Sequence, residues 1–205
     1  MITIIDYNMG NIASIQNMLK KIDCETIVTS DADVLKDAEK IILPGVGSFD
    51  YGMKNLNDLG IIEVLKEKVI VQHTPLLGIC LGMQLLTEDS EEGKLRGLGF
   101  IKSHTKKFSK DMCGEMQKIP HMGWNYVYPK ENILLFKNSL DDMRFYFVHS
   151  YYVECQDECD IIATTEYGNS FTSAIGRDNI YGVQFHPEKS HKYGMNLLKN
   201  FVELL

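Results

Sequence analysis

A cysteine between two glycines is the first group in this chain that could do covalent chemistry. Gly78-Ile79-Cys80-Leu81-Gly82 follows an apolar run and precedes a helical pattern, as in the tight strand-to-helix turns that carry nucleophiles. Such a turn strains the backbone of the nucleophile, and side chains at the flanking positions would collide with neighbouring backbone. Cys80 would lie at a helix N-terminus, which favours the thiolate, and the N–H of Leu81 would help to bind an oxyanion. A buried, unreactive cysteine in a turn explains this motif alone about as well.

A histidine and a carboxylate follow the last predicted strand and could complete a site for acyl transfer. His186-Pro187-Glu188 comes directly after an apolar strand pattern. Residues two apart face the same side of an extended segment, so both side chains could point at one site. His186 would take the thiol proton and later protonate the leaving amine, while Glu188 would orient the imidazole. A surface histidine or a structural His–Glu pair also fits this motif alone, but together with the cysteine turn it predicts a Cys80–His186–Glu188 triad.

The elements that would position these groups alternate between strand and helix patterns in the first half of the chain. Predicted strands cover residues 2–6, 25–29, 40–43 and 74–79, and predicted helices cover residues 12–22, 31–38, 48–59, 61–71 and 81–87. Alternation of this kind indicates crossover connections and a parallel sheet with helices on both faces.

The second half of the chain is richer in strand patterns. Predicted strands cover residues 98–104, 124–128, 144–149, 160–166, 171–177 and 180–185, with turns at 168–169 and 178–179 and a final helix at 192–205. We find no repeat or linker. The sequence therefore predicts one α/β domain over residues 1–205, flavodoxin-like, with a mostly parallel central sheet and an antiparallel extension.

Composition limits the class of protein further. A net charge of -7 argues against a nucleic-acid or anionic-membrane partner, and no apolar run approaches the roughly 18 to 20 residues that span a bilayer. The first six residues lack the basic start and long apolar stretch of a signal peptide. The five cysteines match neither a disulfide scaffold nor a metal site with a second Cys/His pair. We expect a reduced, cytoplasmic protein without a metal.

With these two motifs, the sequence resembles the class I glutamine amidotransferases of the triad type. Within that family it is similar to the glutaminase subunits of imidazole glycerol phosphate synthases. The resemblance covers essentially the whole chain, through the segments 6–11, 43–49, 78–86, 119–125, 147–151 and 184–190. It implies that Cys80 attacks the side-chain amide of glutamine, that ammonia leaves, and that water activated by His186 releases glutamate. This chemistry requires no metal or organic cofactor.

The resemblance also implies roles for residues that otherwise look ordinary. It places the second part of the oxyanion hole, beside Leu81, at Val46 and Gly47. It implies that glutamine is bound by Gly45, Gln84, Glu92, His149, Ser150 and Tyr151. From the residues alone, the glycine-rich segment would be a simple turn, Glu92 a solvated charge, and the aromatic strand part of the core.

A partner subunit follows from the same resemblance. Free ammonia needs a sheltered route to an acceptor, and no second domain is present to supply one. The resemblance implies a (β/α)₈-barrel cyclase in a 1:1 heterodimer, forming imidazole glycerol phosphate and an aminoimidazole carboxamide ribonucleotide in histidine biosynthesis. It places Asn11, Trp124 and Lys189 at the interface. A helix N-cap explains Asn11 equally well, and a lone tryptophan is more often buried in the core.

Three alternatives remain open at this stage. A paralogous subunit could supply ammonia to a sugar-nucleotide-modifying enzyme of surface-polysaccharide biosynthesis, which the segments 145–152 and 190–195 favour. A non-catalytic scaffold could regulate a partner, although it would need no reactive thiol. A stand-alone cysteine hydrolase would not need the glutamine-binding residues that the resemblance implies.

Overall fold

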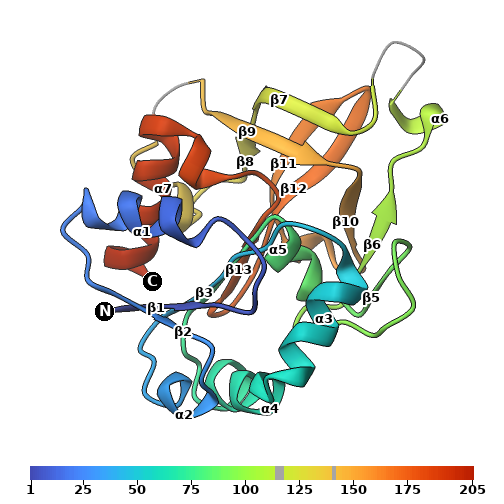
Figure 1. Cartoon of the computed structure of the whole chain (residues 1–205). Helices are drawn as coiled ribbons and strands as arrows, with labels where there is room; N and C mark the ends of the chain where they lie inside the picture. Colours follow the sequence, from blue (N-terminus) through green and yellow to red (C-terminus); the bar gives the residue numbers. More distant parts are fainter. Residues whose placement is uncertain (114–117, 140–141) are drawn as a thin grey trace.

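The first half of the chain builds a parallel sheet between two layers of helices (Figure 1). The computed structural model describes residues 1–113, 118–139 and 142–205. The strands here are β1 (Ile2–Ile5), β2 (Thr26–Thr29), β3 (Ile41–Leu43) and β4 (Leu76–Ile79). The helices are α1 (Ile12–Lys20), α2 (Ala32–Leu35), α3 (Phe49–Asp58), α4 (Ile61–Lys66) with a π-helical end (Glu67–Val71), and α5 (Leu81–Leu85).

The second half extends this sheet with mostly antiparallel strands. Its elements are β5 (Asp89–Ser90), β6 (Ser103–Lys107), α6 (Lys110–Cys113), β7 (His121–Tyr126), β8 (Tyr128–Pro129), β9 (Arg144–His149), β10 (Tyr151–Cys155), β11 (Ile161–Tyr167), β12 (Asn169–Arg177), β13 (Ile180–Val183) and α7 (His191–Leu204). Short 3₁₀ turns lie at Leu134–Phe136, Glu158–Asp160 and Pro187–Lys189.

Strand order explains how the two halves join. In the described part of the chain, the main sheet runs β2-β1-β3-β4-β13-β12-β10-β6-β5, and β11 pairs with β12 and β8. The neighbours from β2 to β13 are parallel, whereas β13 pairs with β12, and β12 with β10, in the antiparallel sense. The predicted fold class is confirmed. The last parallel strand, β13, lies beside β4 and leads directly to His186.

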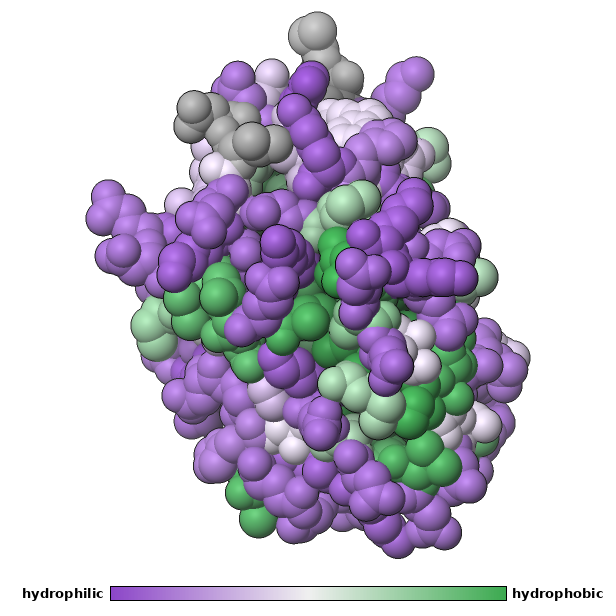
Figure 2. Space-filling model, turned by 90° about the vertical axis from the view of Figure 1, so that its left-hand side faces the viewer, coloured by the Kyte–Doolittle hydropathy of each residue, from purple (hydrophilic) through white to green (hydrophobic). Residues whose placement is uncertain are grey.

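The core lies in two layers, one on each face of the parallel strands. Alternate residues of one strand serve different layers, as a period of two requires. Ile42 of β3 packs with α1 and α7, while its neighbours Ile41 and Leu43 pack with α3 and α4. Figure 2 views the side of α1 and α7, where hydrophilic side chains separate smaller apolar patches. No helix in the described ranges is long and apolar enough to cross a membrane.

One predicted strand is largely wrong, and two strands, the two-residue β5 and the longer β10, were not predicted. Residues 98–102 are not a strand, because β6 begins only at Ser103. The N–H groups of Leu98 and Phe100 instead donate to the carbonyl oxygens of Leu85 and Leu86 at the end of α5. This apolar run therefore covers a helix end, a role that hydrophobicity alone does not distinguish from a strand.

The longer of the two strands that were not predicted is β10. The aromatic run that contains it continues from β9 with only Ser150 between them. At Ser150 the chain passes from a separate two-stranded sheet, β7-β9, into the main sheet, where β10 pairs with β6 and β12. The run thus belongs to two sheets, and the passage between them borders the cavity described below.

Candidate active site

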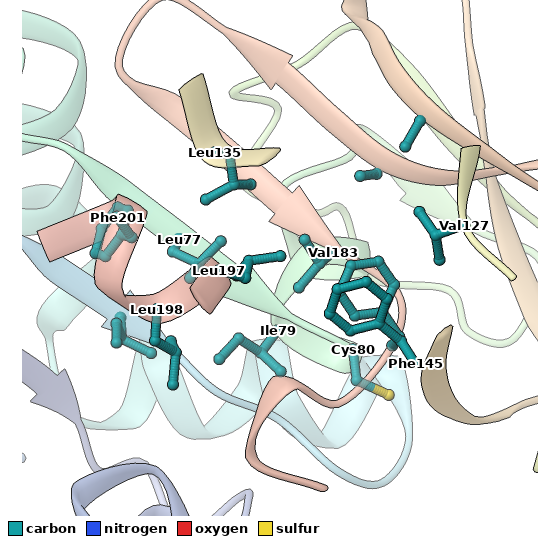
Figure 3. Close-up of a cluster of buried hydrophobic side chains, with 14 of the residues drawn as sticks. Leu77, Ile79, Cys80, Val127, Leu135, Phe145, Val183, Leu197, Leu198 and Phe201 are labelled. Carbon is teal, nitrogen blue, oxygen red and sulfur yellow. The ribbon is translucent and has the colours of Figure 1, made fainter. Parts of the chain in front are cut away.

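Cys80 occupies a strained turn between β4 and α5. Its backbone has φ 54° and ψ -108°, a conformation that residues other than glycine rarely adopt. A Cβ on Gly82 would lie 1.8 Å from the carbonyl oxygen of Leu43, and one on Gly78 would lie 2.7 Å from that of Gly82. The structure therefore confirms the strained turn and the need for both glycines. In Figure 3 the sulfur of Cys80 projects beyond Ile79 at the end of the apolar core.

His186 and Glu188 lie beside this turn and are almost completely buried. The Nδ1 atom of His186 donates to a carboxylate oxygen of Glu188 at 2.7 Å. This bond selects the tautomer in which neutral His186 has a free Nε2 to accept a proton. Nε2 has no hydrogen-bond partner of ordinary geometry. Hydrogen bonds between catalytic groups are often long before substrate binds, so this arrangement fits a general base.

The segment that carries these residues is tied to β9. The N–H of His186 donates to the carbonyl oxygen of Tyr146 at 2.9 Å. Ser190 joins the two segments again, because its hydroxyl donates to the carbonyl oxygen of His186 and accepts from the N–H of Tyr146. The imidazole is thus positioned by β9, a strand of the separate two-stranded sheet, as well as by the end of β13.

Electrostatics couple the base to the nucleophile. Burial alone would lower the pKa of His186, but the close Cys80 thiolate, the hydrogen bond to Glu188 and the negative charges of both groups raise this pKa from 6.5 to about 10. An imidazolium is thus favoured while Cys80 is a thiolate. A thiolate held beside an imidazolium is the form that attacks a carbonyl carbon.

A cavity of about 260 Å³ opens above Cys80. It is lined by Val46, Gly47, Cys80, Leu81, Gln84, Glu92, Pro120, Val148, His149, Ser150 and Tyr151. Drug-sized ligands occupy pockets of roughly 300 to 1,000 Å³, so this cavity suits a ligand of amino-acid size. A larger hollow of about 720 Å³ lies beside Met1 and Cys24, but no histidine lines it to activate a thiol. All the residues expected to bind glutamine line this one cavity, except Gly45, which precedes the lining residue Val46 but does not line the cavity itself.

The expected oxyanion donors are only partly available. The N–H of Leu81 donates to the carbonyl oxygen of Gly45 at 3.3 Å. A second anchor lies at the same loop, where the hydroxyl of Tyr7 donates to the carbonyl oxygen of Pro44. Val46 is 49% exposed, Gly47 has φ +127°, and both residues line the cavity. An oxyanion would therefore have to displace the carbonyl oxygen of Gly45 in order to accept a hydrogen bond from the N–H of Leu81.

Two buried glutamines link the cysteine to the far wall of the cavity. Gln84 donates to Gln184 at 3.0 Å, and Gln184 lies 3.7 Å from the Cys80 sulfur. Gln84 also lies 3.4 Å from the carbonyl oxygen of Tyr151. We had assigned no role to Gln184 from the sequence. Its position two residues before His186, on the same face of an extended segment, is the signal that could have found it.

A chain of two histidines supports this far wall. His149 Nδ1 donates to the carbonyl oxygen of Tyr151 at 2.6 Å, so its Nε2 accepts from His121 Nδ1 at 3.0 Å. Asn125 completes the chain by donating to His121 Nε2 at 3.2 Å. Burial lowers the pKa of His149 to about 3 and that of His121 to about 4. Both imidazoles are therefore neutral, and the side-chain nitrogens of His149 are occupied within the protein.

The three expected interface residues lie outside the cavity. Trp124 is 46% exposed on β7 and stacks on His191, so it is not a core residue. The ammonium of Lys189 lies 5.6 Å from the ring centre of Tyr146, which also packs edge-on against Trp124. Asn11 is exposed and caps α1 by accepting from the N–H of Ser14, as the alternative explanation predicted.

The fold and the site together define the family of this chain. It belongs to the class I glutamine amidotransferases, whose family model matches residues 3–204. The imidazole glycerol phosphate synthase subunit HisH 2 of Methanococcus maripaludis is 59% identical over 203 residues, covering 99% of each chain. The subunit HisH 2 of Pseudomonas aeruginosa is 47% identical over 205 residues, covering 100% of both. These relatives confirm the resemblance inferred from the motifs.

Solved structures agree on the fold. The structure of PurLQS from Thermotoga maritima matches with a TM-score of 0.71 at 19% identity, covering 98% of this chain and 96% of that one. At this identity the match shows a shared fold and nothing more. It agrees with the mixed sheet and the helical layers described above.

Proposed function

We propose that this chain is the glutaminase subunit of an imidazole glycerol phosphate synthase and supplies ammonia for histidine biosynthesis. Cys80 forms a γ-glutamyl thioester with glutamine while ammonia leaves with a proton from His186. Water, deprotonated by His186, then releases glutamate. Glu188 keeps the imidazole in the tautomer that both steps need.

The proposal rests above all on one observation. A cysteine in a strained turn faces a buried His186–Glu188 pair at the floor of a cavity of amino-acid size. A scaffold has no use for such a pair, because burying a carboxylate and an imidazole is costly without a chemical function. Family membership and the similarity to HisH subunits then favour glutamine as the substrate.

A synthase subunit of the (β/α)₈-barrel type is the proposed partner, in a 1:1 heterodimer that we place in the cytoplasm. It would dock on the face that carries Trp124, Lys189 and Asn11. Exposed aromatic side chains support this choice of face, because tryptophan and tyrosine are enriched at interface hot spots. The partner would control activity through the loop at Val46, because the carbonyl oxygen of the preceding Gly45 accepts the hydrogen bond of the Leu81 N–H. Moving this loop would free that N–H to bind the oxyanion.

Glutamate release from glutamine tests the proposal. The purified chain would be assayed alone, and then with the barrel subunit from the same organism and its ribonucleotide substrate. We expect strong activation by the partner with its ligand, and loss of activity in Cys80→Ala. Glutaminase activity that this partner does not stimulate would contradict the proposed ammonia acceptor but would leave the assignment of the catalytic triad intact. No Cys80-dependent activity in any mixture would favour the scaffold.

A second acceptor has one observation in its favour. Two of the similar relatives are named HisH 2, which indicates organisms with more than one such subunit. A duplicated subunit could donate ammonia to a sugar-nucleotide-modifying enzyme instead. Complementation of a histidine auxotroph that lacks its own glutaminase subunit distinguishes the two, because growth without histidine requires the synthase partnership.

A further inference from the structure

Glu92 is held in the cavity wall by an exchange of hydrogen bonds with the first turn of α3. One oxygen of its carboxylate, Oε2, accepts from the N–H of Phe49 at 2.8 Å. One residue further on, the carboxylate of Asp50 accepts in return from the loop that carries Glu92. The N–H groups of Lys94 and Leu95 both donate to Asp50, at 2.9 Å. Helix and loop therefore hold each other through two carboxylates.

The fit between this loop and Asp50 is close. A Cβ on Gly93 would lie 1.9 Å from Oδ1 of Asp50, so only glycine allows the carboxylate to reach the two following N–H groups. The other backbone bonds of residues 92 and 93 go to Ser90, within the same loop. They shape the loop without attaching it to the helix.

The loop needs such an anchor because little else holds its tip. Lys94, Leu95 and Arg96 are exposed, and the ion pair of Arg96 with Asp89 lies at the surface. Exposed ion pairs of this kind contribute little. A carboxylate that accepts two backbone N–H groups is a stronger anchor, since charge-assisted hydrogen bonds are the stronger ones.

We propose that Asp50 is a positioning residue, which fixes Glu92 so that its second carboxylate oxygen meets the α-ammonium group of glutamine. This inference rests on the proposed function, because it assumes that glutamine occupies the cavity. Among the described residues, Oε2 of Glu92 is used by Phe49, and no hydrogen bond to Oε1 occurs. Asp50 itself does not line the cavity and acts only through the loop.

Ligand affinity in the Cys80→Ala background tests the inference without turnover. L-glutamine would be compared with glutaramate, the same molecule without the α-amino group, by titration calorimetry. We expect Asp50→Ala to weaken glutamine binding between about ten- and hundredfold, the usual range for losing a hydrogen bond to a charged group. Glutaramate binding should not change. Glu92→Ala should show the same selective loss, and the double variant should be no weaker than Glu92→Ala alone.

Matched variants separate this role from a general loss of structure. Asp58→Asn alters an exposed carboxylate of the same helix, paired with Lys54, and should bind both ligands normally. Asp50→Asn keeps the size and one acceptor, and should give an intermediate loss even if Asp50→Ala does not fold. Equal weakening of both ligands, or no weakening, would overturn the inference. Failure of the Cys80→Ala chain itself to bind glutamine would overturn the proposed function instead.

Discussion

The two sides of the cavity are built in different ways. On the catalytic side, Cys80 and His186 follow the neighbouring parallel strands β4 and β13, and each belongs to a short continuous motif. On the recognition side, Glu92, His149 and Tyr151 come from a loop and two strands of different sheets, and each is held by residues distant in the sequence. The first side is specified by local backbone geometry, and the second by tertiary contacts.

This difference predicts that the catalytic side tolerates less change than the recognition side. The catalytic turn meets backbone atoms of β3 directly, so it has no adjustable neighbour. The recognition side is connected through side chains, such as the His121–His149 pair, whose contacts depend on protonation and on packing. We expect substitutions of the catalytic side chains to act on the chemical step, substitutions in the catalytic turn to act on folding, and those on the recognition side to act on affinity and stability.

The largest expected effect is that of Glu188→Gln. The amide keeps the size of the side chain but removes the charge that stabilises the imidazolium and its tautomer. We expect kcat to fall by roughly 10² to 10⁴ with little change in KM. Steady-state glutamate release with the activating partner measures this. Glu203→Gln, on the exposed face of α7, is the control and should be fully active. A change confined to KM would contradict the view that the catalytic side acts on the chemical step and the recognition side on affinity.

Gly82→Ala tests whether backbone contact specifies the catalytic turn. The new Cβ would lie 1.8 Å from the carbonyl oxygen of Leu43, so β3 and the turn must separate. We expect the free energy of unfolding to fall by about 3 kcal/mol or more. Gly60→Ala has a positive φ but open space around it, and should cost about 1 kcal/mol. Urea denaturation measures both, and equal losses would contradict the argument from contact.

Acid should weaken the recognition side first. Burial lowers the pKa of His149 to about 3 and that of His121 to about 4, so between these values and 6.5 the unfolded chain binds more protons. The contribution of the two neutral histidines to the free energy of unfolding is therefore complete above pH 6.5. As the pH falls to about 4.5, protonation of each histidine in the unfolded chain should lower that free energy by about 2.5 kcal/mol.

The pKa of His186 is raised instead, so its contribution is present below pH 6.5 and is lost only as the pH rises towards 10. Denaturation curves across the acid range test this separation. In His149→Gln the free energy of unfolding should fall less steeply between pH 6.5 and about 4.5. An unchanged dependence on pH would show that the two neutral histidines do not cause the loss of stability in acid.

The smallest expected effect lies outside both sides, at Asn11. Its side chain caps α1, and Asn11→Ala should lower the free energy of unfolding by about 1 kcal/mol. Asn11→Ser keeps a capping oxygen and should be nearly as stable as wild type. If Asn11→Ser still loses activation by the partner, the residue also acts at the interface. Normal activation in that variant would show that Asn11 serves only as the N-cap of α1.

The sequence by itself determined the catalytic side of this protein. Its motifs are local, and the turn at Cys80 and the strand before His186 follow from the spacing of glycines and apolar residues. Alternating patterns likewise predicted the parallel sheet and its helices, because periodicity reports which face is buried. The family could be inferred from these motifs because they are continuous segments that follow one another along the chain in the order typical of the family.

Only the tertiary structure decided the recognition side. The apolar run at 98–102 covers the end of α5 instead of forming a strand, and the run through Ser150 is divided between two sheets. The contacts of Asp50 and His121 join residues from separate elements, so no spacing along the chain reveals them. The physical reason is that backbone strain and periodicity are properties of neighbouring residues, whereas a binding wall depends on which distant N–H groups and imidazoles find partners when the core packs.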